Sequence, residues 1–63
     1  MQNNIRILRK ELGFSQEKLA KHSRVSRQTI NAIENNKYDP TLELAFRLAK
    51  ILGVKVDDLF FRD

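Results

Sequence analysis

Residues 15–37, SQEKLAKHSRVSRQTINAIENNK, constrain the fold more than any other part of the chain. Ser15 and Ser26 each stand where a helix can begin, because a serine side chain accepts a hydrogen bond from the free amides of a first helical turn. Residues 23–25 separate the two segments. The stretch therefore predicts two short helices joined by a three-residue turn.

The few apolar residues of this stretch stand where two crossing helices would pack: Leu19, Ala20, Val25, Ile30 and Ile33. Ala20 is small enough to let the helices cross closely. The side opposite Ile30 and Ile33 carries four polar residues within an arc of about 100°: Arg27, Gln28, Asn31 and Asn35. One face of the second helix is therefore directed into protein, and the other is free for a partner.

The free face carries side chains that suit nucleic-acid bases. An arginine fork matches the two acceptors of guanine, and a glutamine or asparagine amide matches the acceptor and donor of adenine. Arg27 and Gln28 lie in the first turn, the part of a recognition helix that reaches deepest into the groove. The face could also be merely solvated, but the two caps, the turn and small Ala20 in register favour a helix-turn-helix motif that binds double-stranded DNA.

Sixty-three residues make one small domain, residues 1–63, whose core is only marginally able to stabilise itself. The chain has no cysteine, no signal-like start and no apolar run long enough to span a membrane. Its single histidine, His22, has Lys21 and Arg24 as neighbours, which would repel a metal cation. We therefore expect a cytoplasmic protein that is not an enzyme and has no metal, cofactor, membrane or small-molecule partner.

The net charge of +4 is unevenly distributed along the chain. Residues 1–37 carry eight lysines and arginines against three acids, hence +5, and residues 38–63 carry four against five, hence −1. The positive half is the half that contains the predicted motif. This is the distribution expected if that half faces a polyanion.

The motif and its surroundings resemble a known family. With Arg9 before it, residues 39–42 after it and residues 53–60 at the end, the chain is similar over nearly its whole length to the phage-repressor and Cro family, the lambda-repressor-like domains. The segment SRQTINAIENNKYDPTLELA is especially similar to short bacterial regulators of the xenobiotic-response-element type. The resemblance implies an all-α fold of five helices, in which the second and third form the helix-turn-helix.

The resemblance also implies roles for individual residues. The residues implied to read bases are Arg27, Gln28 and Asn31. The residues expected at the DNA backbone are Gln16, Ser26, Asn36, Lys37 and Tyr38. For Tyr38, packing within its loop is an equally open alternative. Arg9 and Glu34 are similar to a family pair that forms a buried ion pair between the first and third helices, the alternative being two separate surface charges.

Two residues depart from the family pattern. The family usually has glycine in the turn and after the third helix, where this chain has Arg24 and Asn36. Asparagine tolerates positive φ better than other residues with a side chain, so Asn36 is expected to keep a left-handed cap. Arg24 predicts either a strained left-handed residue or a turn of different shape.

The remaining sequence predicts three more helices. Asn4 or a neighbour can cap a first helix that ends before Gly13. A fourth helix is expected from about Leu42 to Leu52, and a short final helix from about Val56 to Phe61.

The apolar side chains of the fourth predicted helix cover about 220° of its circumference, wider than the ~100° stripe that one core requires. Phe60 and Phe61 are adjacent, so one of them is expected to point away from the core. A homodimer interface explains both features, and a flap of the final helix over its own core is the alternative. The residues assigned to the interface are Phe46, Ile51, Phe60 and Phe61.

The sequence thus indicates a sequence-specific regulator of transcription that binds double-stranded DNA. We expect it to act as a repressor, bound as a homodimer to an inverted-repeat operator. An alternative of another class is an antitoxin-like module whose main role is to cover a partner enzyme. Substituting Arg27 and Gln28 separates the two, because only the regulator needs them.

Overall fold

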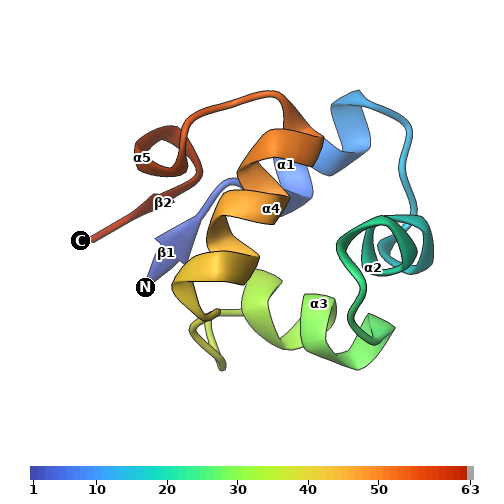
Figure 1. Cartoon of the computed structure of the whole chain (residues 1–63), viewed down its shortest axis with the longest axis horizontal. Helices are drawn as coiled ribbons and strands as arrows, with labels where there is room; N and C mark the ends of the chain where they lie inside the picture. Colours follow the sequence, from blue (N-terminus) through green and yellow to red (C-terminus); the bar gives the residue numbers. More distant parts are fainter. Residues whose placement is uncertain (63) are drawn as a thin grey trace.

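The computed structural model describes residues 1–62, and in that span the chain forms five helices and two short strands (Figure 1). In chain order the elements are β1 (Gln2–Asn3), α1 (Ile5–Glu11), α2 (Gln16–Ser23), α3 (Arg27–Glu34), α4 (Leu42–Leu52), α5 (Val56–Leu59) and β2 (Phe60–Phe61). The five predicted helices are confirmed. The two strands, of two residues each, add a small sheet to this helical fold.

The two strands join the ends of the chain. They pair antiparallel, with Gln2 opposite Phe61 and Asn3 opposite Phe60. The last helix, predicted to reach about Phe61, ends at Leu59 because Phe60 adopts extended angles, φ −118° and ψ 138°. The amide of Asn4 then donates to the carbonyl of Leu59 at 2.9 Å, which extends the connection beyond the strand pair.

The strand geometry separates the two adjacent phenylalanines, because successive residues of a strand point to opposite faces. Phe60 is 9% exposed and belongs to the hydrophobic core, whereas Phe61 is 44% exposed. The prediction that one of the two points away from the core is confirmed. The assignment of Phe60 to a dimer interface is corrected, since this side chain is buried within the core of the single chain.

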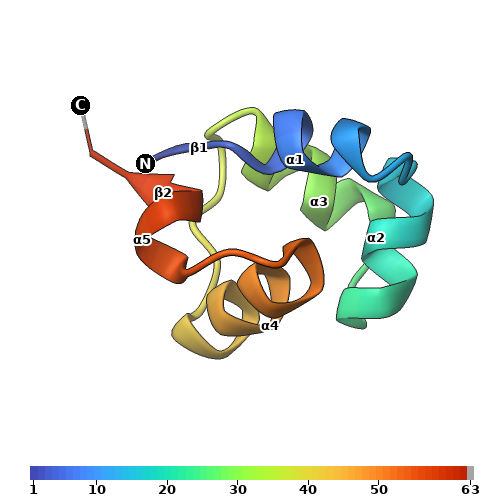
Figure 2. The ribbon, with the colours of Figure 1, turned by 90° about the horizontal axis from the view of Figure 1, so that it is seen from above.

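The helices surround one core. Figure 2 shows α1 and α4 on opposite sides of the molecule, with the paired chain ends at one end and α2 at the other. The largest fully buried apolar side chains come from five different helices: Ile5, Leu19, Ile30, Ile33, Leu48 and Leu59. Both helices of the predicted motif are therefore anchored from behind by the same core.

The starts of α1 and α4 are capped by different side chains. Asn4 occupies the N-cap position of α1 but makes no side-chain cap bond; the neighbouring Asn3 accepts instead, from the amide of Ile5 to its Oδ1 at 3.1 Å. Helix α4 has the predicted bounds, and the Oγ1 of Thr41 accepts from the amide of Leu44 at 3.2 Å. No helix within residues 1–62 combines the length and the apolar character needed to cross a bilayer.

Candidate nucleic-acid interface

Both helices of the predicted motif begin with a serine cap. The Oγ of Ser15 accepts from the amide of Lys18 at 3.0 Å, and the Oγ of Ser26 accepts from the amide of Thr29 at 3.1 Å. Each serine satisfies an amide that the first helical turn leaves free, which fixes where the helix starts. The two predicted caps are confirmed.

The turn between α2 and α3 contains a left-handed arginine. Arg24 has φ 64° and ψ 38°, and the amide of Val25 donates back to the carbonyl of Ala20 at 3.1 Å. This is the ordinary closing pattern of a helix that ends in a left-handed residue. Of the two alternatives left by the sequence, the strained residue is the one observed, at a cost on the order of 1 to 2 kcal/mol.

Packing of α2 against α3 buries the apolar residues of the motif and leaves a polar face. Leu19, Ala20, Ile30 and Ile33 are at most 3% exposed, and Val25 packs against them from the turn. On the other side of α3 the side chains are exposed: Arg27, Gln28, Asn31 and Asn35. The arrangement is a rigid helix that presents hydrogen-bonding side chains outward from a buried support.

Comparison with known proteins decides the family. The helix-turn-helix family HTH_3 matches residues 5–59. An uncharacterized HTH-type transcriptional regulator of Methanocaldococcus jannaschii is 53% identical over 60 residues, which cover 95% of this chain and 91% of that protein. The chain belongs to the helix-turn-helix family of transcription regulators. It is thus a DNA-binding regulator and, by the character of this family, not an enzyme.

Solved helix-turn-helix structures share the fold. The N-terminal DNA-binding domain of SinR, the master biofilm regulator of Bacillus subtilis, superposes with a TM-score of 0.81 at 28% identity, covering 100% of this chain and 94% of that one. The clp gene regulator ClgR of Corynebacterium glutamicum gives a TM-score of 0.80 at 30% identity over 86% of this chain. This chain spans only 57% of the ClgR chain. SinR has also been solved in complex with DNA.

The residues expected to touch the DNA backbone lie at the start of α2 (Gln16), at the start of α3 and in the loop after α3. Ser26 is the cap of α3, and Lys37 and Tyr38 are exposed in the loop that follows it. Asn36 has φ 61°, so the predicted left-handed cap is confirmed. The side-chain amide of Asn36 is hydrogen-bonded to strand β1: its Oδ1 accepts from Nδ2 of Asn3 at 3.1 Å, and its Nδ2 donates to Oε1 of Gln2 at 3.2 Å.

The last residue of α3, Glu34, carries a buried carboxylate. The Nε of Arg9 donates to Oε2 of Glu34 at 2.7 Å, and its Nη2 donates to Oε1 at 3.2 Å, so the pair implied by the family resemblance is present. Arg9 and Glu34 are each 8% exposed. The remaining Nη1 of Arg9 donates to the carbonyl of Phe14 at 2.8 Å. The fork thereby ties α1, the α1–α2 loop and α3 together.

Sequence reasoning missed two further donors on this carboxylate. The Nε of Arg6 donates to Oε1 of Glu34 at 3.3 Å, and the Nε2 of Gln16 donates to the same oxygen at 3.1 Å. Burial would raise the pKa of Glu34, but the hydrogen bonds from Arg9 and Gln16, the charge of Arg9 and the bond from Arg6 together lower it below 4.5. The three-residue spacing of Arg6 and Arg9, which places both on one side of α1, was the available signal.

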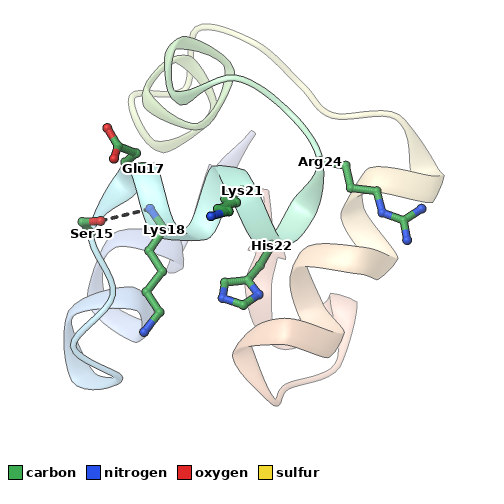
Figure 3. A pocket seen from close by; sticks show the side chains of 6 residues that line it. All are labelled: Ser15, Glu17, Lys18, Lys21, His22 and Arg24. Atoms are coloured by element: carbon green, nitrogen blue, oxygen red, sulfur yellow. Dashed lines mark hydrogen bonds between the residues drawn. The ribbon is translucent and has the colours of Figure 1, made fainter.

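His22 has an aromatic and not a metal-binding environment. Its ring stacks on Phe14 with centroids 5.7 Å apart, and the ammonium of Lys18 lies 4.7 Å from the centre of the same phenyl ring. Figure 3 shows Lys18 and His22 directed to the same side of α2, beside an open hollow that the motif's first cap, Ser15, also lines. Across residues 1–62, no three metal-ligating side chains gather at one point.

Proposed function

We propose that the chain represses transcription by binding an inverted-repeat operator as a homodimer, with α3 of each subunit in the major groove. The observation that carries the proposal is the exposed face of α3, from which Arg27, Gln28 and Asn31 project while the opposite side is held in the core. Side chains of these types on a fixed helix fit the edges of base pairs. Repression requires only that the protein occupy its operator. We expect the protein to be cytoplasmic.

The readout is tested by selecting bound sequences from a random DNA pool and measuring variants on the selected site. Arg27→Ala should lose about 1 to 3 kcal/mol of binding free energy and relax the preference at one base pair, most simply a G·C. Gln28→Ala should do the same at a neighbouring pair. Lys50→Ala, which removes an exposed cation from α4, is the control and should leave the preference unchanged. Retention of the wild-type preference in both α3 variants would contradict the assignment.

Backbone contacts are tested by the salt dependence of binding. Each phosphate neutralised by a protein cation adds a slope of about −0.9 to the plot of log affinity against log salt. Lys37→Ala should therefore weaken binding to all sequences alike and reduce the steepness by about 1. An affinity that does not depend on salt would exclude DNA as the target.

The dimer is proposed from the apolar surface that the subunit leaves uncovered. Leu42 and Phe46 lie one turn apart on α4 and are 69% and 58% exposed, and Phe61 on β2 is 44% exposed. Ile51 is half-buried and packs against the core of its own subunit, so its share in an interface is smaller. A twofold contact through this surface would separate two recognition helices by about 34 Å, one turn of DNA.

Phe46→Glu tests the dimer, since a charge at this exposed site should prevent association without disturbing the core. Sedimentation should show a folded monomer, and affinity for the full site should fall toward that for a half-site. Ile7→Glu changes an equally exposed residue on α1 (60%) and is the matched control. A wild-type protein that is monomeric at high micromolar concentration and prefers a non-palindromic site would refute the dimer.

The antitoxin-like alternative is separated by the same α3 variants. A module that acts by covering a partner enzyme would keep its activity in cells when Arg27 and Gln28 are replaced by alanine. A repressor would lose it. A reporter gene placed behind the selected operator measures repression directly. If the chain is a repressor, expression of the reporter should rise in both variants.

A further inference from the structure

A continuous chain of hydrogen bonds leads from the buried carboxylate of Glu34 to Asn31 on the recognition face. Arg6 contacts Glu34 through Nε and also Asn35, whose Oδ1 accepts from Nη2 of Arg6 at 3.0 Å. Asn35 in turn reaches Asn31, and Gln16 reaches it from the other side. The orientation of the Asn31 amide therefore depends on four neighbours, and it decides what this residue can recognise.

The orientation of the Asn35 amide is fixed at both ends by groups of unambiguous chemistry. The guanidinium of Arg6 can only donate, so the atom of Asn35 that it contacts must be the oxygen. The backbone carbonyl of Asn31 can only accept, so the atom 2.9 Å from it must be the Nδ2 of Asn35. This Nδ2 also lies 3.1 Å from the side-chain oxygen of Asn31.

The Gln16 amide is oriented in the same way. Its Nε2 lies 3.1 Å from Oε1 of Glu34, a carboxylate oxygen that accepts only. The same Nε2 lies 3.2 Å from Oδ1 of Asn31. Two NH2 groups, from Gln16 and Asn35, thus converge on one atom of Asn31. A flipped Asn31 amide would set its own NH2 against both of them.

The oxygen of Asn31 is therefore saturated, because a carbonyl oxygen has two lone pairs and both are used. Its Nδ2 has no protein acceptor in the part of the chain that the structure describes, and the residue is exposed. Asn31 offers a donor to solvent, while its acceptor is occupied by the two neighbouring side chains.

We propose that Asn31 reads DNA as a donor only, with Arg6, Gln16 and Asn35 as positioning residues that hold its oxygen inward. The inference rests on the proposed function and names the base class that this residue selects. The usual asparagine contact with adenine needs the oxygen to accept from N6, which is excluded here. Guanine presents two acceptors, N7 and O6, at the same edge. Thymine presents a single acceptor, O4. The base that faces Asn31 should therefore be guanine in preference to thymine, and adenine and cytosine should be disfavoured because their N6 and N4 amino groups donate.

The proposal is tested on duplexes derived from the selected operator, with each base pair replaced in turn by the other three. The pair whose preference disappears in Asn31→Ala is the one read by Asn31. Wild-type protein should prefer guanine to adenine there by about tenfold, the lower part of the range for one specific contact. A wild-type preference for adenine at that pair, or no altered preference in Asn31→Ala, would overturn the proposal.

Two variants test the positioning residues by base preference and not by affinity. Asn35→Asp replaces one of the two donors on the Asn31 oxygen with an acceptor, so that oxygen is held on one side only and the preference for guanine over adenine should weaken. Because the preference is a ratio of affinities, the uniform repulsion of phosphate by the new charge cancels. Arg6→Lys keeps the charge beside Glu34 but removes the guanidinium fork that also holds Asn35. The affinity for guanine should then exceed that for adenine by no more than about threefold. An unchanged ratio in both variants would contradict the positioning role.

A measurement on the free protein needs no DNA. In nuclear magnetic resonance spectra, the side-chain NH2 protons of Gln16 and Asn35 should exchange with water more slowly than those of Asn31, which have no protein acceptor. The reverse order would refute the arrangement. If the wild-type protein selects no DNA sequence at all, the proposed function fails. If it selects one but reads adenine with Asn31, only this inference fails.

Discussion

Four helices of this domain end with the same hydrogen bond, but two of them use glycine and two do not. Helices α1 and α4 are followed by Gly13 and Gly53, with φ 73° and 75°, and α2 and α3 by Arg24 and Asn36, with φ 64° and 61°. In each case the next amide donates to a carbonyl five residues back, at 2.9 to 3.1 Å. Helices α1 and α4 end at glycine, which adopts the left-handed conformation without strain. The two motif helices, α2 and α3, end at residues that do not favour it.

Side-chain contacts from elsewhere in the fold account for the difference. The last turn of α2 is held by Arg47, whose Nη1 donates to the carbonyl of Ser23 at 2.7 Å. The last turn of α3 is held by Asn3, whose Nδ2 donates to the carbonyl of Ile33 at 2.8 Å, and by the bonds to Glu34. A left-handed residue with a side chain is therefore found where tertiary contacts determine the helix end. Each of these contacts can be removed by a substitution, which tests the explanation.

The largest expected effect comes from Glu34→Gln, which breaks the attachment of α3 to α1. It would leave the buried guanidinium of Arg9 without a counter-charge, at a cost of about 3 to 5 kcal/mol. This approaches the whole stability of a domain of this size, on the order of 3 to 9 kcal/mol. Urea unfolding followed by circular dichroism at fixed protein concentration measures the loss.

The matched control is Glu43→Gln. Glu43 pairs with Arg47 at 2.7 Å one helical turn away, but its side chain is 83% exposed. Such a pair contributes less than about 1 kcal/mol. Equal losses in the two variants would show that the Arg9–Glu34 bonds do not hold α3.

The same contact predicts how stability depends on pH. Because the folded pKa of Glu34 is lowered from 4.5, its contribution should be complete above that pH and should disappear as the pH falls toward the folded pKa. The slope from one group is at most about 1.4 kcal/mol per pH unit. The difference between wild type and Glu34→Gln isolates it from the other carboxylates. A lowered pKa means that unfolding takes up about one proton at Glu34 in this pH range. If the difference in unfolding free energy between wild type and Glu34→Gln stays constant from pH 6 to strongly acidic conditions, the pKa is not lowered.

Arg47→Met tests the end of α2, because methionine keeps an apolar stem while losing the bond to the carbonyl of Ser23. A hydrogen bond to a charged group contributes about 1.5 to 3 kcal/mol. We expect a loss in that range and faster hydrogen exchange at the amides of the α2–α3 turn. Glu43→Gln again serves as the control, since it removes the other partner of Arg47 and leaves the Ser23 bond. Unchanged exchange in the turn would mean that the α2 end is held by its backbone alone.

Gly53→Ala tests the other side of the comparison with a smaller effect. A Cβ at this position would meet no atom within 4 Å, so the cost is conformational alone, about 1 kcal/mol. Gly13→Ala has an equally open site and should lose the same amount. A loss below about 0.3 kcal/mol in both would imply that positive φ carries little cost in this fold.

Much of this fold follows from short-range sequence signals. Serine caps at residues 15 and 26, and the bounds of α4, are set by local chemistry that a single sequence displays. The end of α5 is not, because a local helical pattern at Phe60 was outweighed by pairing with Asn3, more than fifty residues away. The inward face of Phe60 follows from the same long-range pairing.

The candidate site also combines features that the local sequence predicts with features that only long-range contacts determine. The outward direction of Arg27 and Gln28 follows from the helical period and from the apolar side of α3. What Asn31 presents does not, since its amide is oriented by Arg6 and Gln16 from other helices. A sequence pattern names the side chain on a recognition face, and only the packed structure says which atom of it is free.

The smallest expected effects distinguish the two helix ends that lack glycine. Arg24→Gly should stabilise the domain by about 0.5 to 1 kcal/mol, because it relieves a left-handed arginine at the expense of some added chain entropy. Asn36→Gly should give no gain, since asparagine tolerates this backbone and its amide bonds to Gln2 and Asn3 would be lost. Paired urea titrations measure both. Equal stabilisation of the two variants would mean that backbone strain alone governs these ends, and that the bonds from Asn36 to the N-terminal strand contribute nothing.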